Sequence, residues 1–467
     1  MGSFEAADFK NCPHHNTKSR SILIVNNMFL KQFIPSILVA PQFTMGEARA
    51  SSQERSNQAK LLQAHIVFRH GARTPVFWNP NLTESLHTEA FRGKCELVNL
   101  PPGVAGSHAY PSFYKAVHLD IRDLDGEKKR PRSTVDSFQL KAIYGECRAG
   151  QLTDLGAQQS ANLGKELKNR YGDLSKKANH EKRLWIRTSN VARCVATLEF
   201  VLGEMFYDED SGEEEQIFTT MTAPNEIEWL YPNTRCSLMA QLMFAAKEDW
   251  SNDPVPGSVE VVEELRKRLP PKTFKALHIE GYNFVRVRDY LVSYEQHGLR
   301  RPWINDDELA KKIEDLGAQQ IARYLYHGHD EFSVLSAQAG VGNLLKVIFD
   351  AVLKPKHVET DPKQSSPIVS IVSAHDTTLM PILSACGVWD GKIWPEFCSW
   401  LAFELWDNGT VKLVFNGEVS KSYTIEEFNA LQNKLVPEDG RTWEDLCNDV
   451  HPSLPSLSAT TASGDHW

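Results

Sequence analysis

Arg69, His70 and Arg73 lie close together in the run RHGARTP at residues 69–75. A neutral imidazole is a competent nucleophile, and guanidinium groups bind phosphate oxygens through paired hydrogen bonds. Gly71 lets the backbone turn beside the histidine without a Cβ clash. The residue types therefore favour attack on a phosphoryl group over the alternative, a basic surface turn.

Two later segments share this pattern of an apolar strand that ends in a polar side chain. Arg187 follows one such strand, and His375 and Asp376 follow another. If the three strands are parallel, their carboxyl ends meet at one edge of the sheet, where open α/β sheets collect their active sites. Judged alone, Arg187 has a structural arginine as its less favoured interpretation, and His375-Asp376 has a helix cap. The expected strands cover residues 63–68, 184–186 and 368–374.

The three motifs, in this order, resemble the signature of the histidine acid phosphatases. The resemblance implies a phosphoglycerate mutase-like α/β fold, with a mostly parallel sheet flanked by helices and a mainly helical cap insertion. It implies a metal-independent phosphomonoesterase that needs no cofactor. It also implies that His70 forms a phosphohistidine, that Asp376 protonates the leaving oxygen, and that phosphate is bound by Arg69, Arg73, Arg187 and His375.

Further residues narrow the resemblance within the family. Arg73 separates the chain from the mutase branch, and Asp376 directly after His375 is more typical of acid phosphatases than of inositol phosphate phosphatases. Three short segments resemble the mitochondrial, lysophosphatidate-hydrolysing branch, while residues 76–80 depart from it. These segments are residues 150–153, 230–233 and 394–395.

The expected substrate is therefore lysophosphatidate, with broad small phosphomonoesters as the alternative. Inositol phosphates, or a non-catalytic phosphate-binding protein, are further alternatives; the last would lack the nucleophile or the acid, and both are present. Aromatic side chains at 76–78 and 229–231 either form an apolar wall beside the phosphate site or only pack in the core.

The proposed roles make demands on protonation. Near pH 5 an unperturbed histidine is only about 3% neutral and an unperturbed aspartate only about 7% protonated. Guanidinium groups should lower the pKa of His70, and a bound phosphate should raise the pKa of Asp376. Changes of about 1.5 pKa units in each would make the reactive form common.

Length and composition agree with one α/β catalytic unit. The chain has 467 residues, 41% of them hydrophobic, and a formal net charge of -9, which argues against nucleic acid as a partner. We expect a leader or disordered segment over 1–60, a catalytic core over 61–206 and 336–450, a helical cap over 207–335 and a disordered tail over 451–467. The sequence leaves the oligomeric state open.

The N-terminal segment has two interpretations. The apolar stretch 21–40 contains polar residues and a proline, so it predicts no stable membrane span. Counted from Met1 the segment is an acidic mitochondrial leader; counted from Met28 it is typical of a secretory signal, and the sequons at Asn81 and Asn408 would then permit glycosylation. Loss of Cys12 with a leader would leave an odd number of cysteines, whose spacing shows no metal-binding pairs.

Local patterns predict three further elements. Residues 150–171 form an amphipathic helix capped by Thr153, with Gln159 as a polar gap in its apolar stripe. Residues 191–206 form a second helix, preceded by the capping residues 188–190. Asn408-Gly409 lies between two strand-like runs and predicts a hairpin turn.

Overall fold

The computed structural model describes residues 59–76, 90–95, 115, 117–129, 142–143, 147–207, 216–301, 303–358, 365–436, 441–449 and 451–455. Several predictions lie outside these residues: nearly all of the expected leader, Phe77 and Trp78, the sequon at Asn81, and the tail beyond residue 455.

Eight strands form one mixed, mostly parallel sheet in the order β10-β9-β8-β1-β7-β5-β6-β2. The five strands from β1 to β2 run parallel, while β8, β9 and β10 are antiparallel on the other side of β1. This arrangement confirms the expected fold class. The strands are β1 (Leu61–Arg69), β2 (His118–Arg122), β5 (Leu184–Thr188), β6 (Ile217–Met221), β7 (Val369–Ala374), β8 (Trp400–Trp406), β9 (Val411–Phe415) and β10 (Glu418–Tyr423); β3 (Ala142–Ile143) and β4 (Cys147–Arg148) form a separate pair.

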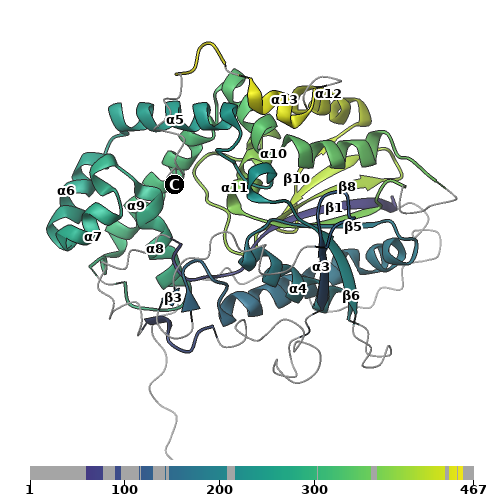
Figure 1. Cartoon of the computed structure of the whole chain (residues 1–467), viewed down its shortest axis with the longest axis horizontal. Helices are drawn as coiled ribbons and strands as arrows, with labels where there is room; N and C mark the ends of the chain where they lie inside the picture. The colour runs from purple at the N-terminus through teal and green to yellow at the C-terminus, as the bar shows by residue number, and fades with distance from the viewer. Residues whose placement is uncertain are drawn as a thin grey trace, which may run out of the picture. The chain divides into compact units, whose positions relative to one another are not determined.

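Helices cover both faces of the sheet (Figure 1). α3 and α4 lie on one face, and α10, α11 and α12 lie on the other, while α5 to α9 form a group beside the sheet. The helices are α3 (Asp154–His180), α4 (Ala192–Phe206), α5 (Ser237–Asn252), α6 (Ser258–Arg268), α7 (Pro271–Ala276), α8 (Phe284–Gln296), α9 (Asp307–Tyr324), α10 (Asp330–Leu353), α11 (Asp376–Ala385), α12 (Ile425–Leu435) and α13 (Trp443–Asn448), with short 3-10 turns at η4 (Asn225–Ile227) and η5 (Ile279–Gly281).

Side chains of β1 alternate between the two cores. Ile66 and Phe68 join the cluster that includes side chains of α3 and α4, whereas Val67 joins the cluster that includes α10 and α11. All three are fully buried. Burial on both faces explains why β1 reads as an almost continuous apolar run, and it fixes the register that brings Arg69 to the end of the strand.

The range expected for the cap needs a correction. Strand β6 lies within residues 207–335 but pairs in parallel with β2 and β5, so it belongs to the sheet. Its residues alternate between buried and exposed positions, which is the period of a strand rather than of a helix. Helical structure in this range begins beyond Met221, with α5 to α9.

The predicted local elements are mostly confirmed, with different bounds. α3 starts at Asp154, is capped by Thr153 and continues to His180. The hairpin at Asn408-Gly409 joins β8 to β9, with Gly409 at a φ of 77°. The expected cap of α4 is wrong: its N-cap is Val191, without a side-chain capping bond.

Helix α10 is the one described helix long and apolar enough to cross a membrane, over Glu331–Leu353 with a mean hydropathy of 1.4. In the fold it packs against α5, α11, α12 and α13. Its apolar character therefore also serves the core on this side of the sheet.

Cysteines outside the expected leader form two disulfides, Cys95–Cys147 and Cys236–Cys447, and leave three thiols. The thiols of Cys194 and Cys386 are buried, and that of Cys398 is half-buried.

Candidate active site

The ends of β1 and β7 bring the first and last predicted motifs together. Arg69 is in register with Ala374, and the backbone N–H of His70 donates to the Ala374 carbonyl at 3.1 Å. The imidazole rings of His70 and His375 consequently lie 5.6 Å apart, edge to face. The predicted meeting of strand ends therefore holds for these two motifs.

His70 is oriented by its own loop. Its Nδ1 lies 2.9 Å from the Gly71 carbonyl, which can only accept, so Nδ1 carries the proton and Nε2 keeps its lone pair. Burial, followed by the charges of Arg193, Arg69 and Arg73, holds the pKa of His70 well below its usual range. The direction is the expected one, and it keeps the imidazole neutral, as a nucleophile requires, at acidic pH.

Asp376 begins α11 and faces Arg69. Its Oδ2 accepts from Arg69 Nη2 at 2.8 Å and from Trp394 Nε1 at 2.7 Å, while Oδ1 accepts from the Thr377 N–H at 2.8 Å. Burial raises the pKa of Asp376, but Arg69, the Trp394 hydrogen bond, Arg73 and His375 together outweigh burial, so the pKa lies below its usual range. The protein groups thus act opposite to the rise expected from a bound phosphate, which stays a prediction.

Arg73 points toward α8. Its Nη2 forms a buried ion pair of 2.7 Å with Asp289 Oδ1, and Asp289 Oδ2 accepts from the Val76 N–H at 2.8 Å. The Phe397 ring lies 4.1 Å from the Arg69 guanidinium and 5.8 Å from that of Arg73. Residues outside the first motif, Asp289 and Phe397, therefore position both of its arginines.

Arg187 has different partners. Its Nη2 lies 2.6 Å from Glu228 Oε1, both side chains are fully buried, and Trp229 lies 4.9 Å from the guanidinium. The same carboxylate oxygen accepts from the backbone N–H groups of Trp229 and Leu230. Arg187 is therefore paired with Glu228, and its role in phosphate binding stays a prediction.

Arg193, in the first turn of α4, lies beside His375 and acts on His70 through its charge. Its Nη2 is 3.5 Å from His375 Nδ1, and it exerts the largest charge effect on both His70 and His375. Burial, followed by repulsion from Arg73, lowers the pKa of Arg193 to about 10. The sequence carried a signal for Arg193, an arginine at the second position of the helix that follows β5, but the position of Arg187 at the end of the strand led to Arg187 being predicted instead.

His375 occupies the N-cap of α11. Its Nε2 lies 2.9 Å from Ser189 Oγ, and its backbone N–H donates to Thr378 Oγ1 at 3.2 Å. Since Arg193 can only donate to Nδ1, Nε2 carries the proton and donates to Ser189. The predicted hydrogen bond from His375 to phosphate would use the same N–H.

The first motif is also supported from behind by α3. A Cβ on Gly71 or on Gly156 would overlap the backbone of the opposite segment, so both must be glycine; Gly71 serves this close approach rather than a positive φ. The Ala72 N–H donates to Gln159 Oε1 at 2.8 Å, which explains the polar gap in the stripe of α3. Thr153 Oγ1 donates to the Ala72 carbonyl at 3.2 Å.

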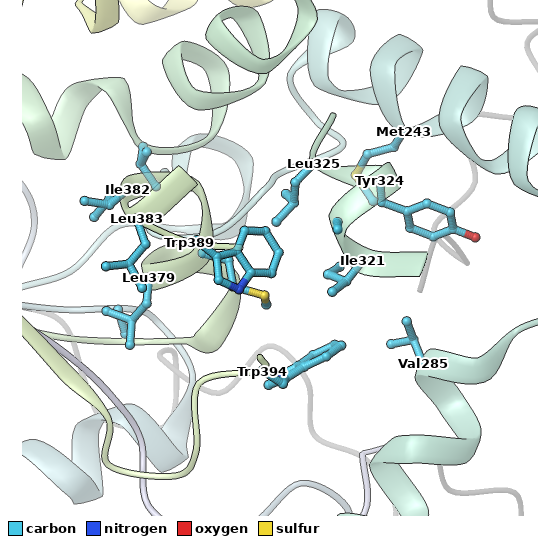
Figure 2. Packing of buried hydrophobic residues seen from close by; sticks show 14 of the residues in the cluster. Met243, Val285, Ile321, Tyr324, Leu325, Leu379, Ile382, Leu383, Trp389 and Trp394 are labelled. Atoms are coloured by element: carbon cyan, nitrogen blue, oxygen red, sulfur yellow. The ribbon is translucent and has the colours of Figure 1, made fainter. Parts of the chain in front are cut away.

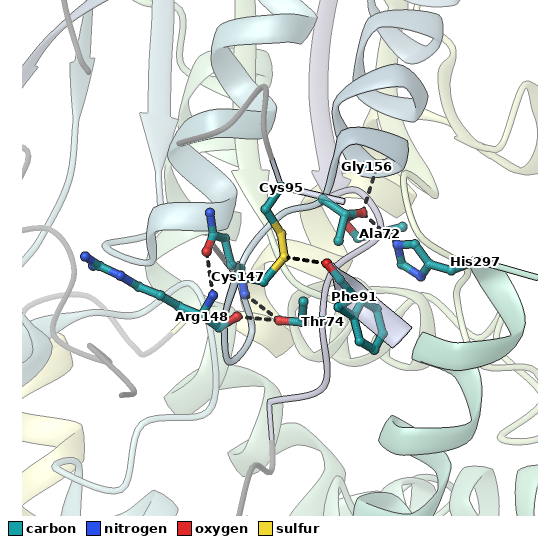
Figure 3. The surroundings of a disulfide bond; sticks show 10 residues. Ala72, Thr74, Phe91, Cys95, Cys147, Arg148, Gly156 and His297 are labelled. Atoms are coloured by element: carbon teal, nitrogen blue, oxygen red, sulfur yellow. Dashed lines mark hydrogen bonds between the residues drawn. A yellow bond between two sulfur atoms is a disulfide. The ribbon is translucent and has the colours of Figure 1, made fainter. Parts of the chain in front are cut away.

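A disulfide fixes the far end of the same loop (Figure 3). Cys147 is bonded to Cys95. The residue after Cys147, Arg148, accepts a hydrogen bond at its carbonyl from Thr74 Oγ1 at 2.5 Å. The Thr74 N–H donates to the Gln151 carbonyl at 3.0 Å. The cross-link therefore restrains the segment against which residues 73–75 are hydrogen-bonded.

Comparisons with known proteins agree with this geometry. The family model of the histidine phosphatase superfamily (branch 2) matches residues 60–270. Lysophosphatidic acid phosphatase type 6 of Mus musculus is 27% identical over 398 residues, covering 80% of this chain and 84% of the relative. The prostatic acid phosphatase of Rattus norvegicus is 24% identical, covering 63% and 80% respectively.

A solved structure gives the same fold. The Hafnia alvei phytase in complex with myo-inositol hexakis sulphate has a TM-score of 0.51 at 13% identity, covering 84% of this chain and 99% of the phytase. The chain is therefore a phosphatase, and its residues 60–270 match branch 2 of the histidine phosphatase superfamily.

Proposed function

We propose that the chain is a metal-independent acid phosphatase that cleaves phosphomonoesters through a phosphohistidine on His70, with lysophosphatidate as its substrate. One observation carries the proposal: a buried, neutral His70, with its Nε2 lone pair available, lies among the guanidinium groups of Arg69, Arg73 and Arg193 and near the carboxyl of Asp376.

The reaction proceeds in two displacements. In the first, the Nε2–P bond forms while the P–O bond to the alcohol breaks, and Asp376 gives its proton to the leaving oxygen. In the second, water attacks phosphorus, the Nε2–P bond breaks, and Asp376 takes the proton from water. His70 returns to its starting form, and the products are the alcohol and inorganic phosphate.

The proton that Asp376 needs comes with the substrate. The second pKa of a phosphate monoester is about 6, so at pH 5 about 90% of the substrate is a monoanion that carries one proton. Transfer of this proton to Asp376 leaves a phosphoryl dianion on the arginines and a neutral acid beside the leaving oxygen. The low pKa of Asp376 among the protein groups is compatible with catalysis on these terms.

The third phosphate-binding arginine in this proposal is Arg193, in place of the expected Arg187. Among the described residues, no carboxylate lies within hydrogen-bond distance of Arg193, whereas Glu228 neutralises Arg187. A guanidinium that has no carboxylate partner contributes most to the binding of a phosphate dianion.

Lysophosphatidate as the substrate is supported by the names of the relatives from Mus musculus and Homo sapiens. The second candidate, a broad-specificity acid phosphatase, is favoured by the burial of Trp229 and Leu230, which pack in the core instead of forming a wall. Tyr231 is closer to the site, with its ring 5.5 Å from that of His375.

A substrate panel separates the two candidates. Lysophosphatidates of increasing chain length should show kcat/KM rising with chain length and exceeding that of glycerol phosphate and of inositol phosphates. Equal values across chain lengths would remove the lipid assignment and leave the broad-specificity phosphatase. A His70→Ala variant, as the control, should be inactive on every member of the panel.

A further inference from the structure

Helix α8 carries two adjacent buried residues of opposite charge, Arg288 and Asp289, which are 6% and 8% exposed. Neither residue belongs to a motif that the sequence singled out. Buried charges are retained only with specific partners, so the partners indicate what the two residues do. They reach two different parts of the active site.

Asp289 acts on the phosphate side. One carboxylate oxygen pairs with Arg73 at 2.7 Å and the other accepts from the Val76 N–H at 2.8 Å, so it clamps the guanidinium and the loop behind it. Its charge also favours the cationic forms of Arg69 and Arg193. A single carboxylate from α8 thus sets both the position of one arginine and the charge of the group.

Arg288 acts on the acid side, through an indole. Its guanidinium lies 4.0 Å from the centre of the Trp394 ring and pairs with Glu314 of α9 at 2.7 Å. The Trp394 Nε1–H donates to Asp376 Oδ2 at 2.7 Å. A chain of direct contacts therefore runs from α9 through α8 to the carboxyl of Asp376.

The indole is held in place by packing (Figure 2). Trp394 and Trp389 lie between Ile321 and Leu325, on the side of α9, and Leu379 of α11. The Trp389 Nε1–H donates to the carbonyl of residue 393 at 2.7 Å. Because Trp394 is 7% exposed, its N–H is confined to one direction.

This direction decides which oxygen of Asp376 carries the reactive proton. Oδ2 accepts from both Arg69 and Trp394, and neither of these groups can accept in return. Both lone pairs of Oδ2 are thus occupied, whereas Oδ1 accepts only from the Thr377 N–H and keeps one lone pair, so the proton of a protonated Asp376 lies on Oδ1. The neighbouring residue Pro395 holds the other partner, since its carbonyl accepts from Arg69 Nη1 at 2.6 Å.

We infer that α8 positions the two halves of the reaction centre separately: Asp289 positions Arg73 for phosphate, and Arg288, through Trp394, positions Asp376 so that Oδ1 delivers the proton. This inference rests on the proposed function, because it assigns positioning residues to that reaction. It predicts that damage to either residue changes a different kinetic quantity.

On the phosphate side, Asp289→Asn keeps an acceptor for the Val76 N–H but removes the charge that offsets Arg73. The inhibition constant of inorganic phosphate should rise about tenfold, because Arg73 is no longer held in place by its ion pair with Asp289. The ratio of turnover for alkyl and aryl phosphates should stay the same, since Asp376 is untouched.

On the acid side, Trp394→Phe keeps the ring and removes the donor. Turnover of alkyl phosphates should fall about tenfold, while that of activated aryl phosphates, which need little protonation, changes less than twofold. The pKa of Asp376 should rise, whereas the loss of activity above about pH 6, which the proton of the substrate sets, should stay where it is in the wild type. The other groups facing this carboxyl, Arg69, Arg73, Arg193 and His375, remain in place.

A second variant guards against a purely structural effect. Arg288→Met removes the cation from the indole face and leaves Glu314, which is 39% exposed, in contact with water. This variant should slow alkyl phosphates more than aryl phosphates, as Trp394→Phe does but by a smaller factor, and it should leave phosphate inhibition unchanged. Glu295→Gln, which removes an exposed carboxylate from the same helix, should match the wild type in every readout.

The test measures phosphate inhibition, the alkyl-to-aryl turnover ratio and the pH profile for the four variants, each at a temperature at which its melting curve shows it to be folded. Separate effects on the two sides support the inference. If Asp289→Asn and Trp394→Phe change the same quantities by similar factors, or change neither, α8 does not position the two halves separately. The proposed function fails in a different way: wild-type enzyme would then form no phosphoryl-His70.

Discussion

A comparison of variants at Arg187 and Arg193 is the sharpest test of which arginine binds phosphate. We expect Arg193→Met to lower kcat/KM by about 10²–10³, because a donor aimed at developing phosphoryl charge is worth about 2.7–4 kcal/mol. Stability should not suffer. A fall of the Arg193 pKa from an ordinary 12.5 to about 10 corresponds to about 3 kcal/mol against its buried charge, so the variant should melt at the same or a higher temperature.

Arg187→Met should behave in the opposite way. It leaves Glu228 as a fully buried carboxylate without its cation, which costs about 3–5 kcal/mol. The unit from Ala59 to Trp467 has roughly 400 residues, so at about 2.1 cal/mol/K per residue the melting temperature should fall by about 4–6 °C. Adding Glu228→Gln should recover much of this loss, because the unpaired charge is removed.

The assay compares kcat/KM for an aryl phosphate and the calorimetric melting temperature of these three variants at a temperature where all are folded. We expect activity loss with Arg193→Met and stability loss with Arg187→Met. The reasoning is refuted if Arg187→Met/Glu228→Gln loses 10²-fold or more in activity while Arg193→Met keeps that of the wild type. Arg187 would then bind phosphate, as its place at a strand exit first indicated.

Other parts of the account make further predictions. Asp376→Ala should slow alkyl phosphates far more than activated aryl phosphates, and equal slowing of both would reject the acid assignment. For wild-type enzyme acting on alkyl phosphates, kcat/KM should fall as pH rises through about 6, where the substrate loses the proton that Asp376 needs while the low pKa of His70 keeps the nucleophile neutral at lower pH; a flat profile from pH 5 to 8 would contradict this. Replacing Cys95 and Cys147 by alanine opens a loop of 52 residues and should cost about 4 kcal/mol, lowering the melting temperature by about 5 °C, whereas an unchanged melting curve would show that the bond adds no stability. Gly156→Ala should abolish activity, because the added methyl group pushes the loop of the first motif away from α3. A kcat/KM within threefold of the wild type would contradict this prediction.

Much of the fold follows from local patterns in the sequence. The apolar runs before Arg69, Arg187 and His375 predicted three parallel strands, and β1, β7 and β5 are neighbours in the sheet. Strand periodicity and the Asn408-Gly409 turn were sufficient there, because each depends on residues close in sequence. β6 was missed because its short alternating pattern lies in a region dominated by helical segments.

The sequence predicted those site residues whose positions depend only on where a strand ends. His70, His375 and Asp376 are brought together by backbone register alone. Whether an arginine faces phosphate or a carboxylate depends on side-chain partners far away in sequence: Glu228 captures Arg187 across 41 residues. No spacing rule encodes such a pairing.

The contacts of α8 could not be predicted either, because they also join residues that lie far apart in the sequence. Asp289 meets Val76 across 213 residues, and Trp394 meets Asp376 only because the chain returns from α11 along the edge of the site. In the sequence, Arg288-Asp289 is one charged pair on an amphipathic helix, which typically faces solvent. Their burial appears only when α8 and α9 are packed beside the sheet.

The central claim is that a phosphoryl group passes through His70. Enzyme mixed with radiolabelled substrate at pH 5 and quenched within milliseconds should carry label on a single peptide, that of His70, and the label should be stable to base and labile to acid. His70→Ala should carry none, and Asp376→Ala should still be labelled by an activated aryl phosphate. An unlabelled wild-type enzyme that turns over normally under these conditions, or label on any other residue, would contradict the account.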